Sequence, residues 1–315
     1  QTLVTPPMGI IIRQFFLLLT LSFINFSIQG ETLWQEKSPL AKSEHIKPLR
    51  VLAAKARYIQ INQSLLTNKF SNLNLATEIT VPLPNGLSIT VKLSPSPILS
   101  EDLAKQYPNF MAYQAQQVDQ PQNIGRFSIS HLGLFGFFRY NNQWMLLSPR
   151  YQGEAIEYAS YWYKDAPSKS EKNTLTADFL LAEEQIAGPE LAQKLVTTGD
   201  KVRTYSLAIS TTGEYTQKLG GTTQNVIAEL MNLVNRINQV VLVDLAIQFE
   251  LVDNQDIIFF DAATDPYTNT DAATDIEENQ SVVDQAIGNQ NYDIGHVLGT
   301  NGGGLAYVGV VCNSQ

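Results

Sequence analysis

The chain has a single cysteine, Cys312, in 315 residues. No disulfide can therefore form within the chain, although exported proteins use disulfides far more often than intracellular ones. In an exported protein, a single cysteine suggests a partner further along a longer chain. A free thiol is the alternative.

Charged residues are sparse, at 16% of the chain, and they form no basic cluster. The 30 acidic residues outnumber the 21 basic ones, which gives a formal net charge of −9. We expect no nucleic-acid partner, because the phosphate backbone is normally met by clustered Lys and Arg. Hydrophobic residues reach 44%, so the chain can bury real cores and has the length for two domains.

The apolar stretch from Phe15 to Phe26 is shorter than the roughly 20 residues that span a membrane. It follows Met8 and Arg13, and smaller and polar residues lead from it to Gly30. This order predicts a signal peptide at residues 8–30, preceded by upstream residues 1–7, and a membrane-spanning helix is the alternative. We expect a secreted, extracellular protein without a stable membrane anchor.

The common catalytic signatures are missing. The three histidines, His45, His131 and His296, are isolated, and the zinc-binding string H-E-x-x-H does not occur. There is no G-x-S-x-G elbow, and Cys312 has no adjacent histidine. Residues 302–304 are glycines but lack the Lys-Ser/Thr of a phosphate-binding loop. The residues by themselves therefore assign no catalytic group and no metal ligand.

Residues 31–165 have mainly strand patterns. Residues 78–83 and 87–93 alternate apolar and polar side chains around Pro84-Asn85-Gly86, which predicts a hairpin. Ser100 is a predicted cap for a short helix that ends near Tyr107. Residues 166–201 turn polar and charged, so we predict a linker between this β-rich domain and a second one.

Residues 202–315 form the second unit. Residues 202–210 and 245–252 read as strands on either side of a long helix that follows Thr222, and a second helix is predicted from about Asp275 to Ile287. Two further apolar runs occur at residues 294–298 and 305–311. The fold class is therefore α+β or α/β, with a sheet covered by helices in this unit.

A duplicated acidic string occupies residues 261–265 and 271–275. Calcium is one hypothesis, because it binds several converging oxygens, but the spacing fits no helix-loop-helix calcium signature. A solvated loop that ends in a helix N-cap is the favoured interpretation.

Two stretches carry a resemblance to a known family: Tyr292-Asp293-Ile294-Gly295-His296-Val297-Leu298, and residues 302–314 with their G-x-A-Y-x-G-x-x-C pattern. They resemble the reprolysin-like (adamalysin-type, metzincin) secreted zinc metallopeptidases. Residues 205–215 and 235–247 are similar to the opening of bacterial reprolysin-like catalytic domains. The resemblance implies that residues 202–315 form an incomplete metzincin catalytic domain, with a mixed, mostly parallel sheet and helices. Residues 31–165 resemble the propeptide of those enzymes, through residues 83–86 and 100–108.

The resemblance implies a metalloendopeptidase whose peptide or protein substrate adds to an edge strand at residues 304–309. Gly304, Leu305, Ala306 and Tyr307 would then bind substrate. Zinc is the cofactor of the complete family members, but their zinc histidines, glutamate and methionine turn have no counterpart here. The resemblance therefore implies a propeptide and the N-terminal part of a catalytic domain, an inactive fragment cut before the zinc motif, in which Cys312 would pair downstream. A secreted, non-catalytic, peptidase-like binding or inhibitory protein is the alternative.

Overall fold

The computed structural model describes residues 32–37, 53, 55–151, 153–166, 201–301 and 304–307. The predicted signal peptide, nearly all of the predicted linker and Cys312 lie outside these ranges. The proposed domain boundaries therefore stay predictions.

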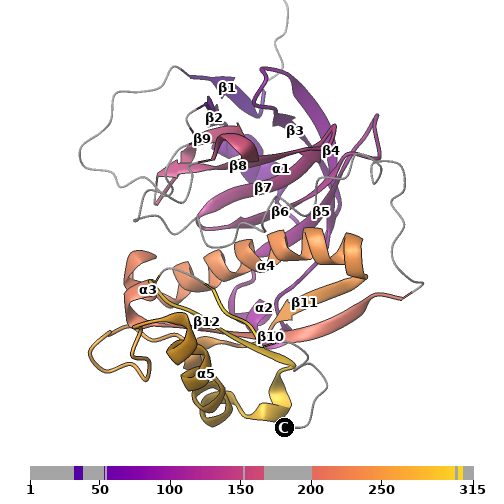
Figure 1. The fold of residues 1–315 in the computed structure, drawn as a ribbon. Helices are drawn as coiled ribbons and strands as arrows, with labels where there is room; N and C mark the ends of the chain where they lie inside the picture. Colours follow the sequence, from indigo (N-terminus) through magenta and orange to yellow (C-terminus); the bar gives the residue numbers. More distant parts are fainter. Residues whose placement is uncertain are drawn as a thin grey trace, which may run out of the picture. The chain divides into compact units, whose positions relative to one another are not determined.

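The first part of the chain builds a nine-stranded antiparallel sheet with the order β1-β2-β9-β8-β7-β6-β5-β4-β3 (Figure 1). Its strands are β1 (Trp34–Glu36), β2 (Arg57–Ile61), β3 (Thr77–Pro82), β4 (Ser88–Pro95), β5 (Met111–Gln117), β6 (Ile124–Ser130), β7 (Gly133–Tyr140), β8 (Gln143–Tyr151) and β9 (Glu154–Trp162). Short helices α1 (Gln63–Lys69) and α2 (Glu101–Gln106) and the 3₁₀ turn η1 (Tyr163–Asp165) interrupt or follow them. The expectation of a β-rich region is met.

The sheet curls until its two end strands approach each other. Trp34 of β1 donates its indole N–H to the Thr80 carbonyl of β3 at 2.6 Å, and the hydroxyl of Ser160 in β9 donates to the Pro82 carbonyl at 2.7 Å. Side chains from β1 and β9 therefore reach the backbone of the end strand β3. This arrangement limits exposure of the edge strands.

The inward faces of these strands form one apolar core. It contains Ile79, Val81, Leu83, Val91, Leu93, Tyr113, Phe127, Leu134, Phe138, Met145, Leu147 and Tyr158. The predicted hairpin is confirmed: β3 pairs antiparallel with β4, and Gly86 turns between them with φ 89°. The capped helix is confirmed as well, since the Ser100 side chain accepts from the Leu103 N–H at the start of α2.

The second part of the chain contains a three-stranded parallel sheet with the order β11-β10-β12. Its strands are β10 (Arg203–Thr211), β11 (Ile247–Leu251) and β12 (Ile294–Leu298). The helices are α3 (Gly213–Lys218), α4 (Thr223–Leu245) and α5 (Ala272–Ile287), with the short 3₁₀ turns η4 (Gln255–Ile257) and η5 (Asn289–Asn291). The predicted long helix, second helix and strands at 202–210, 245–252 and 294–298 are all confirmed within two or three residues.

Helix α4 separates the two sheets. Its apolar side packs on the parallel strands, with Val226, Ile227, Leu230, Met231 and Val234 fully buried beside Leu207, Ile209 and Leu251. Its other side meets β6, where Asn232 pairs with Ser128 and Asn235 with Arg126. By length and composition α4 would also suit a membrane span, but more than half of it is buried, as in the core helix of a folded domain. The α5 helix contributes Val283 to a smaller cluster with Ala208 and Ile257.

Candidate functional site

Strand β12 is an edge strand of the parallel sheet, and the predicted substrate-binding residues 304–307 follow it in the chain. Its residues pair with β10 in parallel register, from Leu207 opposite Ile294 to Thr211 opposite Leu298. In the described part of the chain, no strand pairs with its other side. An unpaired strand edge offers backbone N–H and C=O groups to an extended peptide.

The turn after β12 is fixed by side chains from the loop that precedes α5. Asn269 accepts from the backbone N–H of Thr300 at 3.1 Å and donates to its hydroxyl at 3.1 Å. Asn301 donates to Asp275 at 3.3 Å. A Cβ atom on Gly299 would lie 2.6 Å from the Asn269 Oδ1 atom, so a side chain at this position would displace the amide that binds Thr300. The direction in which the chain leaves β12 is therefore set by hydrogen bonds.

Asp275 is the buried charge of this turn, with only 5% of its surface exposed. Its Oδ1 atom has no hydrogen-bond partner among the described residues. Burial raises the pKa of the Asp275 carboxyl above its usual value, and the nearby charge of Glu278 adds to the rise. Asp271 behaves oppositely: the hydrogen bond from the backbone N–H of Thr274 lowers its carboxyl pKa.

The four residues predicted to bind substrate, Gly304, Leu305, Ala306 and Tyr307, are exposed and belong to no strand. The edge strand predicted at residues 304–309 is therefore wrong for this part, and residues 308 and 309 lie outside the described ranges. A strand needs a hydrogen-bonded neighbour, and the described part of the sheet gives these residues none. Leu305 is 52% and Tyr307 55% exposed, and their role in substrate binding stays a prediction.

The two described histidines are in different segments, His131 in the turn between β6 and β7 and His296 in β12. His131 contacts the Asn225 side chain at 2.8 Å and stacks on Phe110. His296 is exposed on β12, and His45 falls outside the described ranges. Within the ranges that the structure describes, no three His, Cys, Asp or Glu side chains are grouped so that they could hold a metal ion.

The chain was compared with known families and proteins. Residues 227–315 match the model of the family described as Metallo-peptidase family M12B Reprolysin-like. This segment is similar to the reprolysins. The match begins within α4 and includes β11, α5, β12 and the residues 304–307 that follow them. A search of curated proteins found no match.

The duplicated acidic string lies inside the reprolysin-like segment, and its carboxylates bind the backbone. Asp261 accepts from the Ala263 N–H at 3.0 Å, and Asp265 accepts from the Gly213 and Tyr267 N–H groups at 2.6 and 3.0 Å. Asp271 caps α5 by accepting from the N–H groups of Ala273 and Thr274. The predicted N-cap is confirmed, and these contacts favour the turn interpretation over a calcium site.

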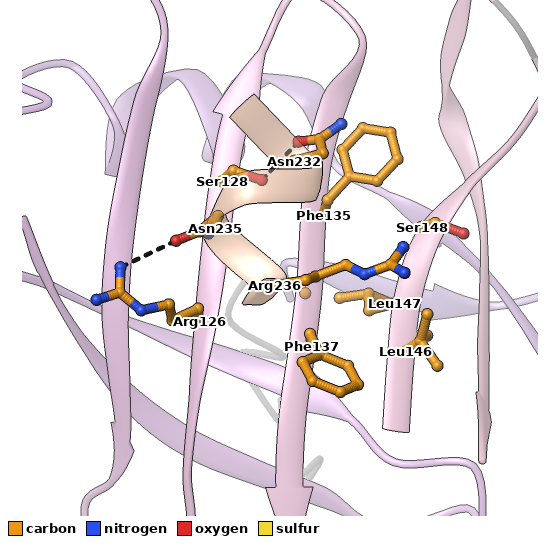
Figure 2. Close-up of a pocket in the computed structure, with 11 residues that line it drawn as sticks. Arg126, Ser128, Phe135, Phe137, Leu146, Leu147, Ser148, Asn232, Asn235 and Arg236 are labelled. Carbon is orange, nitrogen blue, oxygen red and sulfur yellow. Dashed lines mark hydrogen bonds between the residues drawn. The ribbon is translucent and has the colours of Figure 1, made fainter. Parts of the chain in front are cut away.

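A cavity lies where α4 of the reprolysin-like segment meets the outer face of β6, β7 and β8 (Figure 2). Figure 2 shows the Arg126 guanidinium directed at Asn235 and the Ser128 hydroxyl at Asn232, with hydrogen bonds of 3.1 and 2.6 Å. Burial lowers the pKa of Arg126 to about 10. The space inside is about 20 Å³, enough for one water molecule. This cavity is therefore a packing feature between helix and sheet.

Helix α4 also carries a row of buried polar side chains, here called the polar stripe, that was not predicted from the sequence. This stripe consists of four buried polar residues: Asn232, Asn235, Asn238 and Gln239. The three asparagines recur at three-residue spacing. Beside the buried apolar face of the same helix, this spacing indicates a second buried face. The stripe is the side of the reprolysin-like segment that hydrogen-bonds β6 and, through Asn238, the edge of β11.

Proposed function

We propose that residues 202–315 are the N-terminal part of the catalytic domain of a secreted, bacterial-type, reprolysin-like metalloendopeptidase. On this proposal residues 31–165 are its propeptide and residues 8–30 its export signal. The observation that carries the proposal is the family match from residue 227 onward, over a parallel sheet whose edge strand β12 leads into residues 304–307.

The proposed ligand is a peptide or protein in extended conformation. Peptides bind such edges through main-chain hydrogen bonds, while side-chain pockets give the sequence preference. Space around Gly304 is open, since a Cβ built there would have no atom within 4 Å, so a peptide backbone could approach closely. The turn fixed by Asn269 and Asp275 would hold the start of this segment in place.

The residues of this chain do not fit a catalytic zinc ion, which is the cofactor that the family uses. Catalytic zinc takes three protein ligands and a water molecule. The described residues offer no such group, and the sequence contains no H-E-x-x-H. The 315 residues by themselves are therefore proposed to bind peptide without hydrolysing it.

Two measurements on the purified 315-residue protein test this proposal: metal analysis after incubation with zinc and dialysis, and cleavage of fluorescein-labelled casein. We expect far less than one zinc ion per chain and no hydrolysis that a chelator abolishes. Stoichiometric zinc together with chelator-sensitive hydrolysis would overturn the proposed inactivity.

A secreted, non-catalytic binding or inhibitory protein is the second candidate. The lack of a metal-binding group among the described residues favours it. The two candidates differ in what the coding region specifies after Gln315: a zinc-binding helix for the peptidase and none for the binding protein.

A further inference from the structure

The outer edge of β11 pairs with a segment of the β-rich first part of the chain. The Leu251 N–H donates to the Ile98 carbonyl at 2.7 Å, and the Leu251 carbonyl accepts from the Ser100 N–H at 2.9 Å. Leu99 and Leu251 form a parallel β-bridge. Residues 98–100, which follow β4, thus make a single parallel bridge to the outer side of β11.

On the same edge, the backbone groups of Phe249 are paired with a side chain and not with another strand. Asn238 of α4 accepts from the Phe249 N–H at 2.7 Å and donates to the Phe249 carbonyl at 2.8 Å. Phe249 and Leu251 direct their backbone groups to the same side, because they are two residues apart in one strand. Leu251 is therefore the position at which this edge receives another backbone.

The segment that docks there buries three apolar side chains, which makes the site selective for apolar residues at these positions. Ile98 is 1%, Leu99 7% and Leu103 0% exposed, and all three belong to the core cluster that contains Leu207 and Leu251. Burial of these three apolar side chains is what favours docking of this segment over exposure to water. The two backbone hydrogen bonds set direction and register.

Polar contacts hold the far end of the docked segment, at the C-terminal end of α2. Gln106 donates to Asp253 at 3.1 Å and accepts from Gln255. The Tyr107 hydroxyl contacts Gln255 at 3.4 Å. Residues 98–107 therefore contact the parallel sheet and its following loop at both ends and through Leu103, and we call them the docking segment.

We propose that the β11 edge at Leu251 is a peptide-docking site, separate from residues 304–307, for an extended segment in which two consecutive apolar residues precede a helix N-cap. The docking segment is its resident ligand, held in cis. Strand addition of this kind draws affinity from the main chain and specificity from the flanking side-chain pockets.

Covalent connection explains why the resident ligand would exclude competitors. A tethered segment acts at an effective concentration in the millimolar range, so a free peptide cannot displace it at micromolar concentration. Weakening the resident segment in cis should open the site to the same sequence supplied in trans.

The test uses the full 315-residue chain and a fluorescent peptide that copies residues 95–108. One variant combines Ile98→Ser, Leu99→Ser and Leu103→Ser, and Asp102→Ser on the exposed side of α2 is the matched control. Fluorescence anisotropy measures peptide binding, and hydrogen exchange reports protection of the Leu251 amide. A second peptide with the same three serine substitutions controls for nonspecific binding.

We expect the triple variant to bind the native peptide at least about tenfold more tightly than the wild type or the Asp102→Ser control do. The peptide should also restore protection of the Leu251 amide. Circular dichroism checks that the variant keeps its folded sheets; if it does not, Leu99→Ser alone replaces it in the same measurements. Equal binding to wild type and variant, or no binding to a folded variant, would overturn the proposal.

Discussion

The side-chain amide of Asn238 pairs with the backbone of Phe249 as another peptide group would: Oδ1 accepts from the N–H at 2.7 Å, and Nδ2 donates to the carbonyl at 2.8 Å. Asn238 is fully buried on α4, and Phe249 is in β11. This pair ties the long helix to the sheet edge and satisfies both backbone groups of one strand residue.

Replacing Asn238 tests that role. Asn238→Ala leaves the N–H and carbonyl of Phe249 without partners, so we expect the free energy of unfolding to fall by about 2–4 kcal/mol. Urea unfolding followed by circular dichroism measures it. Asn74→Ala is the control, because the Asn74 side chain is exposed, and a change within about 0.5 kcal/mol is expected there. An equally small change for Asn238→Ala would contradict this account of the edge.

Gly213 gives a second stability prediction. A Cβ atom at this position would lie 2.3 Å from the backbone nitrogen of Ala262, a contact that only a backbone shift can relieve. We expect Gly213→Ala to destabilise the protein by about 1–3 kcal/mol. Gly304→Ala is the matched control, since no atom lies within 4 Å of its added Cβ, and its thermal midpoint should not change. Equal midpoints for the two variants would show that the loop at Ala262 yields without cost.

The buried carboxyl of Asp275 predicts a pH dependence. Its pKa is raised in the folded protein, so the unfolded chain loses this proton at lower pH than the folded protein does. The stabilising contribution of Asp275 is thus fully present below its unfolded pKa and is lost as pH rises through its folded pKa. Asp275→Asn, which can still accept from Asn301, should therefore be more stable than the wild type at pH 7, and the gap should narrow toward pH 4.

Asp271→Asn is the comparison, because the pKa of Asp271 is lowered in the folded protein. The stabilising contribution of this carboxylate is present above its unfolded pKa and is lost as pH falls through its folded pKa. Unfolding curves of both variants and the wild type at several pH values give the two trends. Parallel trends for the two variants would contradict the assignment of Asp275 as the buried, destabilised charge.

The exposed side chains of Leu305 and Tyr307 predict a loss of binding without a loss of stability. If residues 304–307 bind peptide, Leu305→Ser with Tyr307→Ala should weaken binding of labelled casein by on the order of tenfold, as expected when two exposed apolar anchors are lost. The thermal midpoint should stay the same, because more than half of each side chain is exposed. Unchanged casein binding would remove this segment from the proposed site.

Local patterns predicted the local structure well. The Pro84-Asn85-Gly86 turn gave the β3–β4 hairpin, Ser100 capped α2, and the apolar period after Thr222 gave α4. Each of these depends on residues within a few positions of one another. The alternation of strands and helices also indicated a sheet covered by helices, and the family resemblance implied that this sheet is mostly parallel.

Long-range pairings were not predictable in the same way. Contacts such as Trp34 with Thr80, or Ile98 with Leu251, join residues far apart in sequence and leave no periodic pattern. Family resemblance indicated a strand at residues 304–307, where the structure shows none, because pairing also needs a neighbouring strand. The three-residue spacing of Asn232, Asn235 and Asn238 was the one local signal of the second buried face of α4.

The central claim is that this chain carries the sheet and peptide edge of a reprolysin-like peptidase without the zinc-binding helix. Reading the coding region beyond the codon for Gln315 tests it most directly. The account predicts H-E-x-x-H-x-x-G-x-x-H within about 60 residues. A stop codon with no such motif in any reading frame would contradict it and leave the non-catalytic binding protein as the function.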